Sequence, residues 1–396
     1  MSEFIISVGI ATRNREYYAE QTIRNTYEIS DNIQVVVSDN SDSNSLQEKL
    51  HDIIDGNRLI YNYFGNKLSV PDNYNNTVEY ATGEYYIAIG DDDIVLPNIV
   101  DFALFMKANS IDALRTSRKL NYRWPSSNKK GRLLVGPFSE YCHMFDPEKG
   151  VITILQNGCQ GYLHTDMAGS YHAITSMDCM RRVKKQTGIY FGGVSPDIYS
   201  AVCLSLLKNI RCAYIDFPVS LPGWCDKSDS YLANKHKAVF PIEEALKMYS
   251  EPEYEWSNLV PYYYTPESTW AESAIKALIA MGREDLIKLY YNRKILVKII
   301  YDRWNDGYKE EMDKYLSSDD LIIAHSNFRY DNANRPRSKM SFLHRKVDVI
   351  NSYIFKDHRR YIGVNDNYEA QVIMAKYIGR RREKNIMRTI LKGEWL

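Results

Sequence analysis

The stretch that decides the fold is Glu84-Tyr85-Tyr86-Ile87-Ala88-Ile89-Gly90-Asp91-Asp92-Asp93. In it, an apolar run typical of a buried strand ends in three consecutive carboxylates. Ligands of open α/β sheets bind at the carboxyl ends of strands, so a ligand site is expected there. Adjacent Asp side chains repel one another, and a cation that prefers oxygen ligands, Mg²⁺ or Mn²⁺, would relieve the repulsion. A solvated acidic loop is the alternative that these three residues alone leave open.

Two further buried strands precede this stretch, and both end in polar residues. Residues 4–10 (FIISVGI) lead into Ala11-Thr12-Arg13-Asn14-Arg15, and residues 34–38 (QVVVS) lead into Asp39-Asn40-Ser41-Asp42. Strands that alternate with short helices predict an α/β fold with a mostly parallel sheet. The polar strand ends should therefore lie along one edge. The other expected elements are strands at 58–63, 85–89 and 111–117 and helices at 16–29, 43–55, 72–82 and 97–107.

The rest of the chain changes character twice. Residues 120–150 are turn-rich and polar, which indicates an insertion or hairpin, and residues 151–240 mix short apolar runs with Gly- and Ser-rich loops. From about residue 241, helical periodicity dominates. We expect a first domain at 1–240, with halves at 1–118 and 119–240, and a mainly α-helical region at 241–396.

The last predicted helix is strongly basic and ends in Trp395-Leu396. A basic amphipathic helix of this kind can lie on an anionic membrane surface. A solvated helix face and a contact between subunits of a homo-oligomer are the alternatives. The cations of this helix, set against Glu383, are Lys376, Arg380, Arg381, Arg382, Lys384, Arg388 and Lys392.

Composition narrows the classes of protein. The 396 residues contain 50 Lys and Arg and 50 Asp and Glu, so bulk electrostatics predicts no nucleic-acid partner. The six cysteines form no CxxC pair, which is typical of reduced thiols in a cytosolic protein. The N-terminal residues do not resemble a signal peptide, and no apolar run is long enough to span a membrane.

The three strand ends together resemble the nucleotide-sugar-binding half of family 2 glycosyltransferases with the GT-A fold. The resemblance is strong over residues 4–100, loose over 101–240, and does not extend to the C-terminal region. One departure is Gly90, which replaces the first Asp of the usual D-x-D-D motif, as in relatives similar to abequosyltransferase. Another is Tyr74, which stands before Asn75 where an Arg is usual. The matching residues are Thr12, Asn14 and Arg15; Asp39, Asn40 and Asp42; Ala81-Thr82-Gly83-Glu84-Tyr85; and Asp91, Asp92 and Asp93.

The resemblance implies a metal-dependent, inverting transfer of a sugar from a nucleoside diphosphate, with UDP favoured, to a hydroxyl of a glycan or lipid-linked glycan. Asp39 would accept hydrogen bonds from the base, and Asp91 or Asp92 would contact ribose or metal-bound water. Asp93 would bind Mn²⁺ or Mg²⁺, which stabilises the leaving diphosphate. The remaining residues expected to bind the nucleotide sugar are Thr12, Asn14, Arg15, Asn40 and Asn75.

An inverting transfer also needs a base that deprotonates the acceptor hydroxyl. By resemblance, this carboxylate stands at the start of a helix about 100 residues beyond the metal motif. Asp197, within Gly192-Gly193-Val194-Ser195-Pro196-Asp197, fits: Ser195 could cap the helix and Pro196 could be its first residue. The alternative is that Asp197 only complements the helix dipole.

A loop at 222–230 and His236 follow a short strand at 213–217. By resemblance, this loop closes over the donor and excludes water, and His236 is a further metal ligand. Trp224 is a candidate for stacking on an acceptor sugar. Asp166 and His172 are weaker candidates for acceptor contacts, and the histidines show no metal-binding spacing.

The expected setting is the cytoplasm, where a peripheral place at the inner membrane is one option, and the resemblance implies synthesis of a surface polysaccharide of the O-antigen, capsule or teichoic-acid type. Two other classes stay open. A sugar-1-phosphate nucleotidyltransferase would need a Gly-rich loop that residues 9–15 (GIATRNR) do not provide. A non-catalytic scaffold could retain the fold and use the C-terminal helices for oligomerisation.

Overall fold

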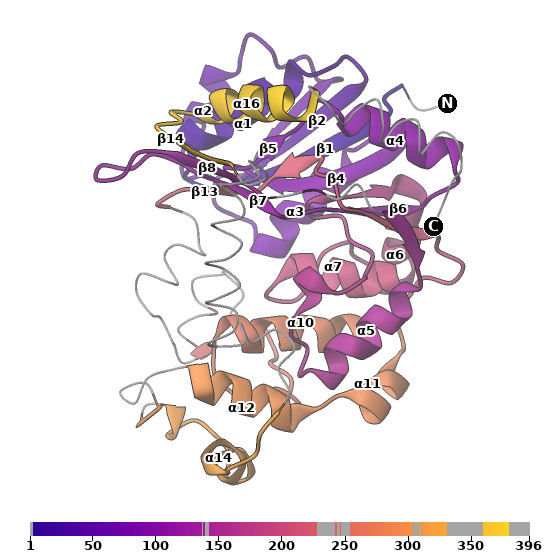
Figure 1. Ribbon diagram of the computed structural model, residues 1–396, viewed down its shortest axis with the longest axis vertical. Coiled ribbons are helices and arrows are strands. Elements are labelled where there is room, and N and C mark those ends of the chain that lie inside the picture. Colours follow the sequence, from indigo (N-terminus) through magenta and orange to yellow (C-terminus); the bar gives the residue numbers. More distant parts are fainter. Residues whose placement is uncertain are drawn as a thin grey trace.

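An eight-stranded sheet forms the centre of the protein (Figure 1). The computed structural model describes residues 3–136, 138, 142–227, 242–243, 246, 254–303, 309–310, 312–330 and 359–379. The strand order is β3-β2-β1-β4-β10-β6-β11-β9, and the first four strands are parallel, as predicted. The strands are β1 (Ile6–Thr12), β2 (Ile33–Asp39), β3 (Leu59–Tyr63), β4 (Tyr85–Gly90), β6 (Ala113–Thr116), β9 (Cys142–Phe145), β10 (Ala173–Ser176) and β11 (Cys212–Ile215).

Alternate side chains of the parallel strands enter two separate cores, one on each face of the sheet. In β2, Val35 and Val37 join the core beneath α1 and α4, whereas Val36 joins the core beneath α3. A strand covered on both faces must be apolar on both faces. The continuous β-branched run of β2 meets this requirement, and all seven of its residues are buried. The helices of this half are α1 (Glu16–Tyr27), α2 (Ser45–Lys49), α3 (Val70–Glu79) and α4 (Ile99–Ala108).

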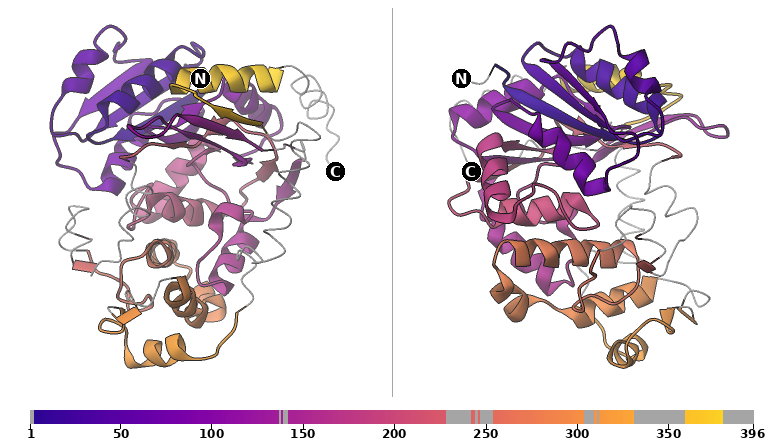
Figure 2. Two further views of the ribbon diagram at one scale, coloured as in Figure 1. Left: turned by 60° about the vertical axis from the view of Figure 1, so that its left-hand side comes forward. Right: turned by 180° about the vertical axis from the view of Figure 1, so that it is seen from behind.

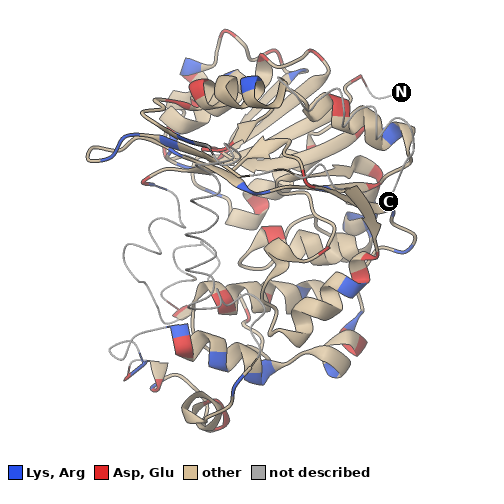
Figure 3. Cartoon of the chain, in the orientation of Figure 1, with Lys and Arg blue, Asp and Glu red and all other residues tan. Residues whose placement is uncertain are grey.

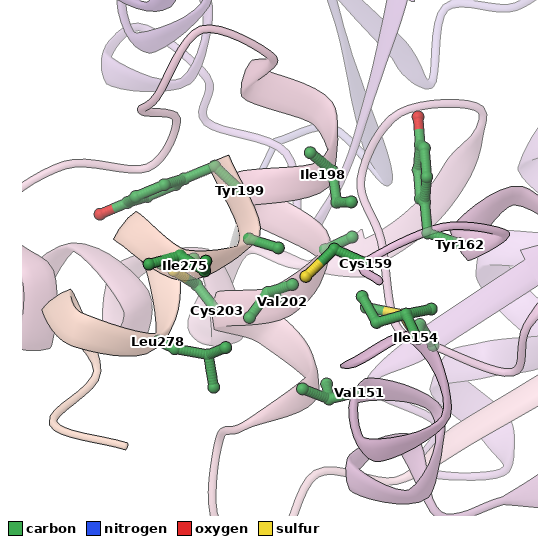
Figure 4. Close-up of a cluster of buried hydrophobic side chains, with 14 of the residues drawn as sticks. Val151, Ile154, Cys159, Tyr162, Ile198, Tyr199, Val202, Cys203, Ile275 and Leu278 are labelled. Atoms are coloured by element: carbon green, nitrogen blue, oxygen red, sulfur yellow. The ribbon is translucent and has the colours of Figure 1, made fainter. Parts of the chain in front are cut away.

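The helical half shares a core with one face of the sheet. Helix α10 packs on α7, and Ile275 and Leu278 of α10 meet Ile198 and Val202 of α7 in the cluster of Figure 4. The side chains of Thr265 and Ser268 satisfy each other's backbone amides at the start of α10, which is a capping box. The helices of this half are α5 (Pro147–Gln156), α6 (Met177–Thr187), α7 (Pro196–Ser205), α10 (Pro266–Ala280), α11 (Glu284–Tyr290), α12 (Arg293–Arg303) and α14 (Ser318–His325), with a 3-10 turn, η1, at Tyr162–His164.

A second, four-stranded sheet has the order β13-β7-β8-β14. Strands β7 (Leu120–Arg123) and β8 (Arg132–Val135) form the hairpin that the turn-rich sequence suggested, and β13 (Gly223–Trp224) pairs with β7. A two-stranded ribbon joins β5 (Ile94–Val95) to β12 (Ser220–Leu221). These short strands lie beside the end of β4 and place the 223–225 backbone against the acidic residues.

The described parts of the region expected as one helical unit, 241–396, lie in two different places in the fold. Strand β14 (Arg359–Ile362) pairs with β8, and helix α16 (Asn367–Gly379) lies on α1, beside the N-terminal part of the chain (Figures 1 and 2). Ala370, Met374 and Ile378 of α16 are buried in the same core as β1. The described part of the basic terminal helix is therefore a component of the first domain, and residues 380–396 lie outside the described residues.

Two sequence expectations concern thiols and membrane spans. None of the six cysteines forms a disulfide, and all but Cys142 are buried. Within the residues that the structure describes, no helix has the length and apolarity needed to cross a bilayer. Positive and negative side chains are spread along the whole fold (Figure 3), in keeping with the net charge of zero.

Candidate functional site

The acidic loop after β4 is buried and tied to the two neighbouring strand ends. Thr12, the last residue of β1, donates a hydrogen bond of 2.7 Å to Asp91, and Arg15 approaches the other oxygen of Asp91 at 2.9 Å. The hydroxyl of Thr22 lies 3.0 Å and 2.9 Å from the carbonyl oxygens of Asp91 and Asp93. The structure thus brings Thr12, Arg15 and the acids together, as expected from a parallel sheet.

The backbone of the 223–225 segment covers the other side of the loop. The Gly223 amide donates to Asp93 at 2.6 Å, and the Cys225 amide donates to Asp92 at 3.1 Å. A β-carbon on Gly223 would lie 1.7 Å from the carbonyl oxygen of Asp92, so only glycine permits this approach. The indole of Trp124 also donates to that carbonyl, at 2.8 Å. Each acid is therefore held by a different set of donors.

The electrostatic environments of the three carboxylates differ. Burial raises the pKa of Asp91, against the opposing effect of Arg15, and burial together with the charge of Asp93 raises the pKa of Asp92. For Asp93, burial is outweighed by His172 and by the amides of Gly223 and Gly90, which lower its pKa. Asp91 and Asp92 are the members whose charged forms a bound cation would stabilise most.

The fit of these residues to Mn²⁺ or Mg²⁺ is uneven. Carboxylate oxygens are ligands that these cations prefer. Asp92 Oδ1 lies 3.8 Å from the positively charged Arg15. Asp93, predicted as the metal ligand, already accepts hydrogen bonds on both oxygens: from Gly223 on one, and from Gly90 at 2.6 Å and His172 at 3.0 Å on the other. Among the described residues, no three Asp, Glu, His or Cys are grouped to hold a metal ion. Direct ligation by Asp93 would require these contacts to open.

The end of β2 lies beside the acidic loop. Asp39 accepts a hydrogen bond of 2.9 Å from the Ser41 amide and another from the Tyr61 hydroxyl. Asn40 binds the backbone of Leu68 through both atoms of its amide, so it shapes the loop before α3. Asn14 has a positive φ of 57°, and its side chain contacts Asp42. The observed contacts of Asn14 and Asn40 position loops around the expected nucleotide site.

Asn75 connects the two halves of the first domain. Its carbonyl oxygen accepts from the amides of Tyr190 and Phe191, each at 2.9 Å, and its amide donates to the Phe191 carbonyl at 2.8 Å. The segment it holds leads into α7. In this structure, Asn75 therefore ties α3 to the chain that precedes Asp197.

Asp197 lies in a pocket of its own in the first turn of α7. Ser195 occupies the N-cap position, but its hydroxyl donates to the Asp197 carboxylate at 2.7 Å and does not cap the helix. Tyr162 donates to the other carboxylate oxygen. Burial raises the pKa of Asp197, and the nearby Arg118 partly offsets the rise. A half-buried carboxylate with a raised pKa in a pocket is suited to accept a proton.

The other predicted site residues have varied surroundings. Trp224 lies beneath the guanidinium of Arg123, 4.2 Å from its ring centre. Asp166 pairs with His143 at 2.9 Å and is half-exposed. His172 is buried between Asp93 and Ser220, a place that favours holding the acidic loop over contacting an acceptor. His236, and the 228–230 part of the expected closing loop, lie outside the described residues.

Sequence reasoning missed several residues that build these two sites. Thr22 lies in α1, the helix that follows Thr12–Arg15. Nothing in a single sequence marks Thr22 as a partner of a loop about seventy residues later. Tyr162 and Arg118 reach Asp197 through a 3-10 turn and a strand end. The placement of Arg115 in a strand, with Arg118 just after its end, is a weak signal by itself.

Comparison with known proteins gives one family match and distant structural likenesses. Residues 7–145 match the family model described as Glycosyl transferase family 2. No curated protein matches the chain. Among solved structures, residues 1–349 of S. aureus TarS in complex with UDP-GlcNAc are 15% identical, with 89% of this chain and 92% of that chain covered and a TM-score of 0.44. The mannosyltransferase PcManGT from Pyrobaculum calidifontis in complex with GDP-Man and Mn²⁺ is 11% identical, with 88% and 87% covered and a TM-score of 0.37.

These structural likenesses are too distant to carry a substrate from either protein to this one. The family match covers β1 to β9 and includes all three polar strand ends, which are the elements that the sheet brings to one edge. Its agreement with the observed topology identifies both the fold and the class of enzyme. Residues 7–145 are similar to glycosyl transferase family 2, and the protein is a glycosyltransferase with a GT-A-like fold.

Proposed function

We propose that this glycosyltransferase moves a sugar from a nucleoside diphosphate to an acceptor hydroxyl with inversion, and that Asp197 is the base. The observation that carries the proposal is the separation of two acidic sites. Asp91, Asp92 and Asp93 lie at the strand ends, whereas Asp197 lies in a different pocket at the start of α7. Inversion needs the base on the opposite side of the reacting carbon from the leaving group.

The donor would occupy the edge formed by β1, β2 and β4. Asp39 would accept hydrogen bonds from a base, and its neighbours Ser41 and Tyr61 fix its carboxylate in one orientation. Arg15, bound to Asp91, presents the positive charge nearest to the acidic loop. UDP is the favoured nucleotide by family resemblance.

A divalent cation, Mn²⁺ or Mg²⁺, would be held by Asp92 and Asp91. Asp93 would support the loop through its contacts with Gly223, Gly90 and His172. When bound, it supplies positive charge to the leaving diphosphate. The protein's own part is to hold the carboxylates: Thr12 and Arg15 orient Asp91, and the Cys225 amide orients Asp92. His172 fixes Asp93 and, through Ser220, ties it to β12.

Asp197 would take the acceptor proton on one of its carboxylate oxygens. Its two hydroxyl donors, Ser195 and Tyr162, keep the side chain in one rotamer before the acceptor arrives. Because burial raises its pKa, the carboxylate is a stronger base than a solvated Asp. The acceptor would be a glycan or lipid-linked glycan of surface-polysaccharide synthesis, at the cytoplasmic face of the membrane.

The first test is a thermal-shift titration with UDP, GDP, CDP and dTDP, each with and without Mn²⁺. A ligand that binds the native state a hundredfold above its Kd raises stability by about 2.7 kcal/mol. We expect one nucleotide to give a metal-dependent shift, and Asp92→Asn to reduce it. No shift with any nucleotide would count against the donor site and favour the scaffold alternative. Incubation of the identified nucleotide's sugar donors with glycan acceptors then tests transfer directly.

A further inference from the structure

Two arginines share the pocket of Asp197, and the proposed mechanism assigns them no role. Arg115 lies in β6 and Arg118 in the segment that follows it, and both line the pocket together with Tyr162 and Tyr171. Neither touches the strand ends at which the donor would bind. Their place beside Asp197 puts two permanent positive charges where the acceptor would enter.

The observed hydrogen bonds use only one nitrogen of each guanidinium. Arg115 donates through Nη2 to the carbonyls of Tyr162 and Leu163, and Arg118 donates through Nη2 to the carbonyl of Tyr171. A guanidinium carries five N–H donors, so each arginine keeps a free edge. The backbone contacts fix where these edges point, which is the preorganisation that a binding site requires.

Within the described parts of the chain, neither arginine has an ion-pair partner. Asp166, whose charge raises the pKa of Arg115, pairs with His143 instead, and Asp197 accepts its hydrogen bonds from Ser195 and Tyr162. Burial and the adjacent charge of Arg118 lower the pKa of Arg115 to about 10. Two half-buried like charges without a bound carboxylate are unfavourable, and an anion between them would relieve the repulsion.

We propose that Arg115 and Arg118 bind an anionic group of the acceptor, a phosphate or a carboxylate, next to the hydroxyl that Asp197 deprotonates. Planar guanidinium forks bind such groups through paired hydrogen bonds. The inference rests on the proposed function, because it takes the Asp197 pocket as the acceptor site. It narrows the acceptor from any hydroxyl compound to one that carries a negative charge a short distance from the reacting oxygen.

Three matched probes test this directly: glycerol, glycerol 3-phosphate and glycerate, which differ in their charged group. Their dissociation constants are measured by NMR titration of the full chain, with and without a saturating nucleoside diphosphate that fills the donor site. We expect at least one anionic probe to bind about tenfold or more tightly than glycerol, the size of one charged hydrogen bond. Tighter binding of glycerol 3-phosphate indicates a phosphate-bearing acceptor, and tighter binding of glycerate a carboxylate-bearing one.

The variants Arg115→Gln and Arg118→Gln should lose this discrimination, Arg118→Lys should keep part of it, and the exposed Arg181→Gln should not change it. Their melting temperatures report whether the variants are folded. Equal binding of all three probes, no binding by any, or full discrimination in both Gln variants would overturn the inference. So would a loss of nucleotide affinity in these variants, because the arginines would then serve the donor. If the wild type binds the anions but no nucleotide, the proposed function fails while the anion site stands.

Discussion

At the scale of the residue, Gly223 controls how closely β13 approaches the acidic loop. We predict that Gly223→Ala displaces this strand, because the new methyl group would lie 1.7 Å from the Asp92 carbonyl oxygen, which is backbone and cannot turn aside. The hydrogen bond from Gly223 to Asp93 would be lost. We expect a destabilisation of about 1–3 kcal/mol in urea unfolding and weaker metal-dependent nucleotide binding.

Gly169→Ala is the matched control, since its new β-carbon would meet only the Ala173 side chain, at 3.9 Å. It should leave the free energy of unfolding and the nucleotide affinity near their wild-type values. If Gly223→Ala behaves like this control, the contact between β13 and the acids does not matter for the site.

Asp197→Asn tests the base. The amide keeps the size of the side chain and can accept from one of the two hydroxyls, but it cannot take the acceptor proton, so transfer should fall by about 10²–10⁴-fold. Nucleotide binding at the strand ends should be unchanged in isothermal titration. Transfer by Asp197→Asn at more than half of the wild-type rate would remove Asp197 from the mechanism.

The pH dependence of transfer follows from the raised pKa of Asp197. The base works in its charged form, so activity should fall as the pH drops through that pKa, which lies above the value of a solvated carboxyl. Arg118 lowers this pKa, so Arg118→Gln should move the acidic limb of the kcat/KM profile to higher pH. A limb that stays in place would show that Arg118 does not act on the base.

At the scale of the element, the capping box of α10 stabilises the helix that covers α7. Thr265→Ala removes the hydroxyl that accepts from the Ser268 amide and should destabilise the fold by about 0.5–2 kcal/mol in urea unfolding. Thr153→Ala, at an exposed position inside α5, is the control and should change stability by about 0.5 kcal/mol or less. Equal effects of the two substitutions would show that the cap contributes nothing.

The elements also show what a single sequence can and cannot predict. Strands β1, β2 and β4 were predicted because they are long apolar runs that end in polar residues, and that pattern is local. The pairing of β10 between β4 and β6 was not, since a four-residue strand with antiparallel neighbours leaves no periodic signal. The expected helix at 43–55 is regular only over Ser45–Lys49. The pairing of β14 with β8 depends on contacts across more than two hundred residues.

The contacts of the candidate site also separate into those that a single sequence predicts and those that it does not. The proximity of Thr12, Arg15 and the three acids could be predicted from the sequence, because the carboxyl ends of parallel strands lie at the same edge of a sheet. The partners of Asp93 could not, because His172 and Gly223 come from other elements and contact it only once the sheet is folded. The role of Asp93 as a metal ligand stays a prediction, as do the roles of Asp39 and Asp197.

At the scale of the whole molecule, the C-terminal residues separate into two parts with different expected roles. Deletion of 367–396 should expose the core under α1 and lower the melting temperature, since Ala370, Met374 and Ile378 are buried there. Deletion of 380–396 should leave the fold intact and reduce binding to anionic vesicles, if the basic segment contacts a membrane. Sedimentation with vesicles of mixed neutral and anionic lipid measures this, and unchanged binding by the shorter deletion would contradict the membrane contact.

Helix α16, which is synthesised late, contacts a residue that supports the proposed donor site. Asn367 at its start donates to the Thr22 hydroxyl at 3.2 Å and accepts from Asn25 at 2.6 Å, and Thr22 in turn holds the carbonyls of Asp91 and Asp93. A ribosome adds about 5–20 residues per second, so α16 would emerge many seconds after β4. We expect nascent chains that lack α16 to bind no nucleotide tightly, so that sugar donors are engaged only by finished protein.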